Sequence, residues 1–204
     1  MKCNLPVHFT GVHGNAVLLA QKFLAEVLQE GCCAVDATAG NGNDTLFLAN
    51  CVGQTGKVYS FDIQPSALEQ TAALLKENGL LERVQLIQAG HENMEKYIKE
   101  VLRAVIFNLG YLPGGDHAMA TKPETTIKAV EAALRKLEPG GRISIVTYTG
   151  HAGAVEESRA LEELAAGLDP KVYGVLKLSF INRSALAPYL VLVERKVTYE
   201  NLAS

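Results

Sequence analysis

The sequence has no excess of positive charge. Nineteen Lys and Arg residues stand against 22 Asp and Glu residues, which gives a formal net charge of −3 and a pI of about 6.0. A protein that coats nucleic acid by charge alone needs a basic face that neutralises many phosphates. The composition therefore argues against that class of protein, and it leaves room only for a local basic patch.

Long apolar runs are also missing. No stretch approaches the ~18 apolar residues that a membrane span needs, and Met1 to Pro6 is followed by Val-His-Phe-Thr-Gly-Val-His instead of a signal-peptide core. We expect a cytoplasmic protein with no membrane partner. With 204 residues, 48% of them hydrophobic, and no repeat or linker-like tract, we also expect one domain over 1–204.

The four cysteines lack the spacing of a metal site. Cys3, Cys32, Cys33 and Cys51 form no C-x-x-C pair and have no matching histidine pair. We therefore expect neither a metal nor a disulfide framework, and we interpret the cysteines as reduced thiols.

Strand-like and helix-like segments alternate along the chain. By apolar spacing and turn residues, strands are expected at 33–38, 57–63, 84–88, 104–108, 142–149, 172–181 and 189–197. Helices are expected at 15–30, 44–51, 65–78, 91–100, 123–137 and 154–167, with Glu138-Pro-Gly-Gly141 closing the fifth. This order predicts an α/β, Rossmann-like fold: a seven-stranded, mostly parallel sheet with an antiparallel last strand and helices on both faces. The two adjacent strands at the end of the chain, with no helix between them, favour the class I methyltransferase sheet over a purely parallel nucleotide-binding fold.

A glycine-rich loop joins the first strand to the next helix. In Asp36-Ala-Thr-Ala-Gly40-Asn-Gly42-Asn-Asp44-Thr45, Gly40 and Gly42 allow a ligand to approach the backbone over the helix N-terminus, which Asp44 is expected to cap. The third glycine of the dinucleotide fingerprint is absent. A carboxylate at Asp44 repels a pyrophosphate but favours an ammonium and a sulfonium. The loop therefore predicts S-adenosylmethionine, with these candidate contacts: Asp36, Thr38, Gly40, Asn41, Gly42, Asn43, Asp44 and Thr45.

An acid follows the second strand, about 20 residues beyond the glycines, where a ribose diol is usually bound. It is Asp62 in Ser60-Phe-Asp62-Ile63-Gln64, and we add Ile63 and Gln64 to the cofactor contacts. Two other interpretations stay open. Asp62 can simply cap the helix that starts at Pro65, and Asp36 can be a buried residue that pairs with loop amides.

The fourth strand ends in Phe107-Asn108-Leu-Gly-Tyr111-Leu-Pro-Gly-Gly-Asp116. Methyltransferases that act on amino nitrogens often carry an N-P-P-Y pattern here, and Asn108 and Tyr111 match its two ends. An amide oxygen accepts the hydrogens of an amine, and an aromatic face stacks on a base. We predict Asn108 and Tyr111 as the catalytic pair, with Asn108 also near the cofactor. The alternative is a turn in which Asn108 caps and Tyr111 packs.

Further polar residues lie at the same predicted rim, where loops after strand ends converge. His91 is predicted to contact the cofactor, although a packing histidine is the common alternative, and Thr125 and Thr126 can simply begin a helix. Lys122 and Arg183, with Lys177, would form a local basic patch. The predicted substrate contacts are Asp116, Lys122, Thr125, Tyr148, His151 and Arg183.

Taken together, these segments and Tyr148-Thr-Gly-His151 resemble the YtqB family, also called MnmM and long labelled an rRNA methylase family. The string Asn108-Leu-Gly-Tyr-Leu-Pro-Gly-Gly-Asp116 is specific for it. The resemblance implies a class I methyltransferase that uses S-adenosylmethionine to methylate the aminomethyl nitrogen of 5-aminomethyl-2-thiouridine at tRNA position 34, in the anticodon region. A homodimer is a further expectation.

One segment departs from the family. Members tend to carry Ile-Asn-x-x-Asn-x-Pro-Pro before the last strand, whereas this chain reads Ile181-Asn-Arg-Ser-Ala-Leu-Ala-Pro188. Asn182 and Pro188 remain, but the second Asn and the first Pro are lost. If this loop contacts RNA or a second subunit, substrate choice or assembly differs in this protein.

Other functions remain open at this point. The methyl acceptor can be rRNA or a small-molecule amine. Tyr173 and Lys177 match the Y-x-x-x-K spacing of NAD-dependent reductases, but on a strand they would stand ~13 Å apart, too far to act as a pair. A non-catalytic RNA-binding module is the third possibility, and the intact set of Gly40, Gly42, Asp62 and Asn108 argues against it.

Overall fold

The computed structural model describes residues 15–110, 121–149, 153–184 and 186–197. The predicted roles of Tyr111, Asp116 and His151 lie outside these residues. No helix in the described ranges is long and apolar enough to cross a membrane.

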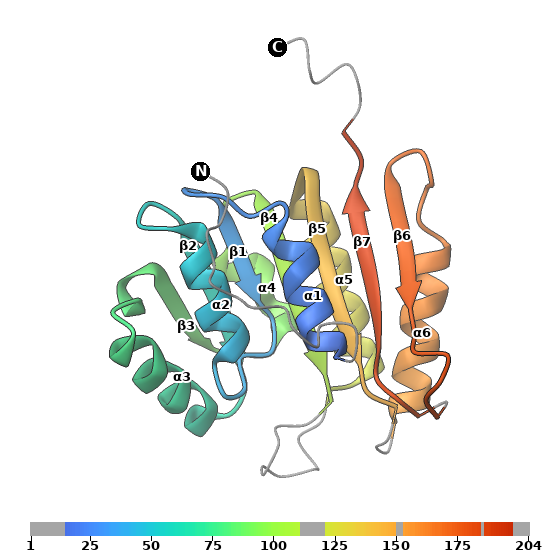
Figure 1. Ribbon diagram of the computed structural model, residues 1–204, viewed down its shortest axis with the longest axis horizontal. Coiled ribbons are helices and arrows are strands. Elements are labelled where there is room, and N and C mark those ends of the chain that lie inside the picture. The colour runs from blue at the N-terminus through green and yellow to red at the C-terminus, as the bar shows by residue number, and fades with distance from the viewer. Residues whose placement is uncertain (1–14, 111–120, 150–152, 185, 198–204) are drawn as a thin grey trace.

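Seven strands form one sheet in the order β3-β2-β1-β4-β5-β7-β6 (Figure 1). Their bounds are β1 Cys33–Asp36, β2 Lys57–Asp62, β3 Val84–Gln88, β4 Leu102–Leu109, β5 Leu137–Thr147, β6 Tyr173–Leu178 and β7 Tyr189–Arg195. Pairings from β3 through β5 are parallel, and β7 is antiparallel to both of its neighbours. The predicted fold class is confirmed, including the reversed last strand.

Helices cover both faces of this sheet (Figure 1). They are α1 Ala16–Ala25, α2 Asn43–Val52, α3 Pro65–Glu77, α4 Met94–Tyr97, α5 Pro123–Lys136 and α6 Ala154–Ala166, with short 3₁₀ turns at Leu81–Arg83 and His91–Asn93. Successive strand residues point to opposite faces. Ala34 and Ile106 therefore pack with α1, α2 and α3, whereas Val35 and Val105 pack with α4, α5 and α6. Burial on both faces explains why these strands are apolar runs and do not alternate.

Several predicted boundaries are wrong. The helix expected over 15–30 ends at Ala25, and the strand expected over 172–181 spans Tyr173–Leu178. Two further differences have a clear physical cause. The helix expected over 91–100 is only a 3₁₀ turn and the single turn α4, because Ile98 leaves helical geometry with an extended backbone and is fully buried in the core. The segment Glu138-Pro-Gly-Gly141 does not close α5 as a turn. It belongs to β5, which begins at Leu137 beside Leu102, and a register shift in β4 accommodates it.

The first helix begins as its sequence suggests. Asn15 is its N-cap, and its side-chain oxygen accepts hydrogen bonds from the backbone N–H groups of Val17 (2.9 Å) and Leu18 (3.3 Å). Helix α1 lies across β5 and β4 and also contacts α2. It therefore brings side chains from the start of the chain close to the carboxyl end of β4.

Gly42 is fixed by packing as well as by backbone conformation. Its φ is +81°, and a Cβ placed there would lie 2.9 Å from the Cα of Thr71 in α3. Gly79 also has a positive φ, +68°, but a Cβ there meets nothing within 4 Å. A comparison of Gly42 with Gly79 therefore separates backbone strain, which a side chain would meet at both positions, from the steric contact, which it would meet only at Gly42.

Gly42→Ala should therefore destabilise the fold more than Gly79→Ala. The strain common to both positions costs ~1–2 kcal/mol, and the contact with the Thr71 backbone should add at least ~1 kcal/mol at Gly42 alone. Urea unfolding of the two variants would measure the difference. Equal losses would show that α3 moves aside without cost.

Candidate cofactor and substrate site

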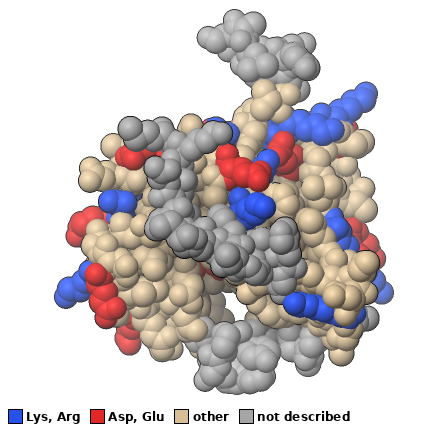
Figure 2. All heavy atoms as spheres, viewed as in Figure 1, with Lys and Arg blue, Asp and Glu red and all other residues tan. Residues whose placement is uncertain are grey.

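Polar side chains gather where β1, β2 and β4 end. Because these strands are parallel, their carboxyl ends share one edge of the sheet, the lower edge in Figure 1, and Figure 2 shows the described surface hollowed there. Ligands of open α/β sheets bind in such a crevice. Most of the predicted cofactor contacts meet at this edge.

Asp36 is the innermost residue of this group and is fully buried. Its carboxylate accepts hydrogen bonds from the Thr38 backbone N–H (3.1 Å) and from the Thr45 hydroxyl (2.6 Å), and that hydroxyl lies 2.8 Å from the Ser60 hydroxyl. Burial, together with the negative charge of Asp44, raises the pKa of Asp36 to about 7. Asp36 thus joins the end of β1 to α2 and β2, and its contacts match the loop-pairing interpretation.

Asp62 lies between the glycine loop and α3. One carboxylate oxygen accepts from the Gly40 backbone N–H and the other from the Gln64 backbone N–H, each at 2.9 Å. The second contact supports the entry to α3, and the first fixes the loop that was predicted to receive the cofactor. Beside it, the side chain of Ile63 is 51% exposed. Asp62 and Ile63 therefore present a carboxylate and an apolar face together.

The glycine loop takes a conformation that other residues rarely adopt. Gly40 and Gly42 have φ values of +52° and +81°, and the Gly42 N–H donates to the Ala39 carbonyl at 2.8 Å. Asn41 and Asn43 are exposed along this turn. The Thr71 hydroxyl donates to the Gly40 carbonyl at 3.3 Å, so α3 supports the loop from behind.

Asp44 does not cap α2, contrary to our prediction. The N-cap is Gly42, and the Asp44 side chain turns inward from the first turn of the helix. Its carboxylate accepts hydrogen bonds from the Gln21 amide (2.7 Å) and from the Asn108 amide. Burial raises the pKa of Asp44, and both of these hydrogen bonds oppose that rise.

Asn108 stands at the end of β4 beside the glycine loop. Its backbone N–H donates to the Thr38 hydroxyl at 2.8 Å, and its side-chain nitrogen faces Asp44. Its side-chain oxygen is buried and has no hydrogen-bond partner among the described residues. An unpaired buried acceptor costs ~1–3 kcal/mol, so it marks a position where a ligand can supply the missing donor.

Two aromatic side chains flank this group. His91 is buried, its ring packs edge-on against Phe107, and its Nδ1 lies 3.1 Å from the Ala37 carbonyl. Burial lowers the pKa of His91, which favours a neutral ring that donates from Nδ1. Tyr148, just past β5, is 38% exposed, and burial together with the charge of Asp44 raises its pKa. Burial and the Asp44 charge thus both disfavour the phenolate form of Tyr148.

The three cations of the predicted basic patch have different surroundings. Lys122 and Arg183 are exposed, and the Arg183 guanidinium lies 4.4 Å from the centre of the Phe180 ring. Lys177 is paired with Glu162 at 2.7 Å, and with Tyr173 it lies on β6, as the argument against a reductase pair assumed. The Thr125 hydroxyl donates to the Lys122 carbonyl at 3.0 Å and so helps to begin α5.

Sequence reasoning missed two buried polar residues. Gln21 falls on the apolar stripe of α1 and is 9% exposed, and a polar residue on such a stripe was a usable signal. Glu157 in α6 is 1% exposed and accepts from the hydroxyls of Thr121 (2.8 Å) and Thr126 (2.5 Å). The Gly110 N–H in turn donates to the Thr121 hydroxyl at 3.1 Å. No local sequence pattern marked Glu157.

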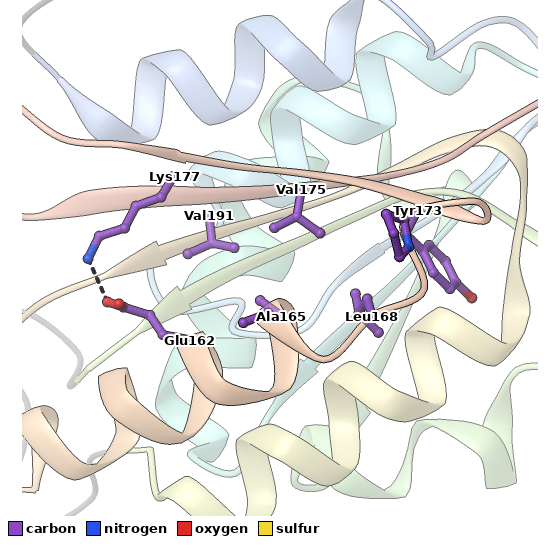
Figure 3. A pocket seen from close by; sticks show the side chains of 9 residues that line it. Glu162, Ala165, Leu168, Tyr173, Val175, Lys177 and Val191 are labelled. Atoms are coloured by element: carbon purple, nitrogen blue, oxygen red, sulfur yellow. Dashed lines mark hydrogen bonds and ion pairs between the residues drawn. The ribbon is translucent and has the colours of Figure 1, made fainter.

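A separate cavity of about 410 Å³ lies between α6 and strands β6 and β7 (Figure 3). Ala165, Leu168, Val175 and Val191 make its wall mainly apolar, while Glu162 and Lys177, which also line it, are paired with each other. On the face drawn in Figure 2, charges of both signs are interspersed. In the described ranges, no group of three or more His, Cys, Asp or Glu residues is arranged to hold a metal ion.

The raised pKa of Asp36 predicts a pH-dependent stability. Between its unfolded value of about 3.9 and the folded value of about 7, the folded protein holds a proton that the unfolded chain releases. The native protein therefore loses stability as pH rises through this window and loses no more above it. Asp36→Asn has no such proton. Its free energy of unfolding, relative to the native chain, should rise from pH 5 to 7 by at most ~1.4 kcal/mol per pH unit and then level off.

Urea unfolding at several pH values would measure this trend. Asp169→Asn, at an exposed carboxylate in the turn before β6, is the matched control. A difference between Asp36→Asn and the native chain that does not change with pH would contradict the assigned cause.

Comparisons with known proteins agree with this architecture. A family model described as "Putative rRNA methylase" matches residues 58–194. A chloroplastic tRNA (mnm(5)s(2)U34)-methyltransferase from Arabidopsis thaliana is 41% identical over 192 residues, which cover 89% of this chain and 70% of that protein.

Solved structures give the same result. An rRNA-methylase structure from Clostridium thermocellum, also described as putative, is 44% identical with a TM-score of 0.87, covering 89% of this chain and 97% of that one. A putative methyltransferase from Streptococcus mutans, in complex with SAH, is 38% identical with a TM-score of 0.82, covering 89% and 98%. The sheet order, the strand-end site and these similarities lead to one conclusion: the chain belongs to the "Putative rRNA methylase" family of class I, S-adenosylmethionine-dependent methyltransferases.

Proposed function

We propose that this protein transfers a methyl group from S-adenosylmethionine to the aminomethyl nitrogen of a modified uridine at tRNA position 34. The observation that carries the proposal is the unpaired, buried Oδ1 of Asn108 next to the glycine loop. An acceptor is what a primary amine needs in order to be held with its lone pair free. The 41% identity to a tRNA (mnm(5)s(2)U34)-methyltransferase supports the choice of substrate.

The residues at the strand ends fit the cofactor. Asp62 offers a carboxylate for ribose hydroxyls, and the exposed side chain of Ile63 offers an apolar face for adenine. Asn41 and Asn43 of the glycine loop are exposed and would contact the methionine part, and the nearby negative charge of Asp44 favours its ammonium and sulfonium. Gly40, Thr38 and Gln64 complete this set, with His91 packed below it.

The cofactor supplies an activated methyl group: the amine lone pair forms the N–CH₃ bond while the S–CH₃ bond breaks, S-adenosylhomocysteine leaves, and the extra amine proton goes to solvent. The task of the protein is orientation. Asn108 Oδ1 accepts one N–H of the neutral amine and directs its lone pair. Holding the cofactor and the substrate together in the reactive geometry can contribute ~7–11 kcal/mol in all, of which this contact is one part. A cationic sulfonium nearby disfavours the protonated amine, which promotes the reactive form.

Contacts to tRNA would come from side chains around the same edge. Lys122 and Arg183 are exposed and can reach phosphates, and Tyr148 presents a partly exposed ring for base stacking. Because the remaining charges are mixed in sign, we infer that a few local contacts and not a broad basic face hold the RNA. We place the reaction in the cytoplasm, although the Arabidopsis relative is chloroplastic.

The rRNA alternative draws on the family description, and mass spectrometry separates the two. The protein would be incubated with S-adenosylmethionine and, in separate reactions, total tRNA or rRNA from a strain lacking this modification, and the nucleosides would then be analysed. We expect one methyl group on the aminomethyl nitrogen of the wobble uridine. A methyl group found only on rRNA, on a ring carbon or on a ribose oxygen would overturn the proposal.

Asp62→Ala should weaken cofactor binding. Hydrogen bonds from hydroxyls to a charged acceptor contribute ~1.5–3 kcal/mol, so calorimetry should show an affinity for S-adenosylhomocysteine that is lower by a factor of about 10 or more. Asp169→Ala is the control, and circular dichroism checks the fold. An unchanged affinity in a folded variant would reduce Asp62 to a residue that supports the start of α3.

Asn108→Ala should affect turnover far more than cofactor affinity. Displacing a reacting atom by about 1 Å lowers the rate ~10²-fold, so we expect a loss of that order with an affinity within a few-fold of the native value. Asn50→Ala, at an exposed asparagine of α2, is the control. Full turnover of Asn108→Ala with methyl still arriving on nitrogen would show that Asn108 is a turn residue.

A further inference from the structure

Three side chains from distant parts of the sequence form one hydrogen-bonded row. Gln21 of α1 donates from Nε2 to Asp44 Oδ1 at 2.7 Å, and Asn108 of β4 donates from Nδ2 to Asp44 Oδ2. Gln21 is 9% exposed and Asp44 is 7% exposed. Buried polar groups are expensive unless they are paired, so an apolar residue at position 21 would be the simpler filling for this face of α1.

The row has only one orientation for each amide. A carboxylate accepts hydrogen bonds and donates none, so both amides must turn their NH₂ groups toward Asp44. For Asn108 this leaves Oδ1 on the opposite side, where it is buried and without a partner in the described part of the chain. The orientation that holds an amine is therefore imposed by Asp44 and not by Asn108 itself.

We propose that Asp44 and Gln21 are positioning residues that fix the carboxamide of Asn108 with its oxygen toward the substrate amine. This inference rests on the proposed function. In the reversed orientation, the Asn108 NH₂ group would face the amine and donate to the lone pair that must attack the methyl group. Gln21 saturates the second oxygen of Asp44 and so keeps the carboxylate from turning away from Asn108.

Substitutions at positions 44 and 21 can change which hydrogen-bond donors and acceptors face Asn108, while Asn108 itself is kept. In Asp44→Asn, the new amide can present either its oxygen or its nitrogen to Asn108, so both orientations are allowed. Adding Gln21→Glu places an acceptor at position 21, which draws the new NH₂ group there and leaves its oxygen for Asn108, as in the native protein. Adding Gln21→Lys places a donor there and forces the reverse.

The experiment compares kcat at saturating cofactor and tRNA for the single variant and the two double variants. We expect Q21E/D44N to exceed Q21K/D44N by a factor of about 10 or more, with D44N in between, because the second double variant misdirects the reacting nitrogen. Affinity for S-adenosylhomocysteine, measured by calorimetry, separates this effect from the loss of charge at Asp44. Equal kcat values, or a higher value for Q21K/D44N, would overturn the inference.

A matched control tests whether the negative charge that Gln21→Glu adds is enough by itself to change kcat. Gln29 lies just beyond α1 and is exposed, so Q29E/D44N should have the kcat of D44N. Thermal unfolding checks that each variant is folded. If Q21K/D44N does not fold, D44N and Q21E/D44N still decide the matter, because only the inferred row predicts a gain from the second substitution.

A readout independent of activity is the ¹H–¹⁵N signal pair of the Asn108 side-chain amide, assigned by its disappearance in Asn108→Ala. Donation to a carboxylate should shift one proton of this pair downfield, and the shift should be lost in D44N and absent in Q21K/D44N. Failure of the native protein to methylate tRNA would contradict the proposed function alone. An Asn108 signal pair that D44N leaves unchanged would contradict the positioning role alone.

Discussion

The site depends on the buried carboxylate of Asp36 at the end of β1. It binds the Thr38 N–H and the Thr45 hydroxyl, and through Thr45 it reaches Ser60 on β2. One side chain thereby fixes the start of the glycine loop, the first turn of α2 and the neighbouring strand. Since Thr38 also receives the Asn108 N–H, the end of β4 is held in the same network.

Such a network makes the site rigid before any ligand arrives. Buried polar networks are stabilising only when their members are satisfied. Around Asp36, Asp44 and Asp62 each carboxylate has two hydrogen bonds from this chain. Against this background the unpaired oxygen of Asn108 stands out. The acids that shape the loop are satisfied, whereas Asn108 Oδ1, like the hydroxyls of Thr147 and Thr149 at the end of β5, is buried without a partner in the described part of the chain.

The sequence predicts much of the fold and of the cofactor loop, because helix, strand and turn formation depend largely on residues that are close together in the sequence. Periodicity places the strands and most helices, and the order of units predicts the reversed final strand. The loop with Gly40 and Gly42 and the acid Asp62 follow from spacing along the chain. Among the features that escaped prediction, three depend on contacts between remote segments. They are the inward turn of Asp44, the arrival of Gln21 from α1, and the extension of β5 through Pro139 and Gly140, where pairing with β4 overrides the turn preference of these residues.

Glu157 has a consequence for how this fold can diversify. It holds Thr121, which both donates its backbone N–H to the Gly110 carbonyl (3.0 Å) and accepts the Gly110 N–H, so Gly110 just past β4 and Thr121 just before α5 are fixed side by side. Glu157 of α6 and the Gly110–Thr121 hydrogen bonds hold the two ends of the intervening segment together. The entropic cost of closing such a loop grows only slowly with its length. A change in chain length between residues 110 and 121 therefore leaves Asn108 and the cofactor loop in their places. The length of the chain at this edge of the sheet can thus vary in evolution without displacing the strand end that carries Asn108.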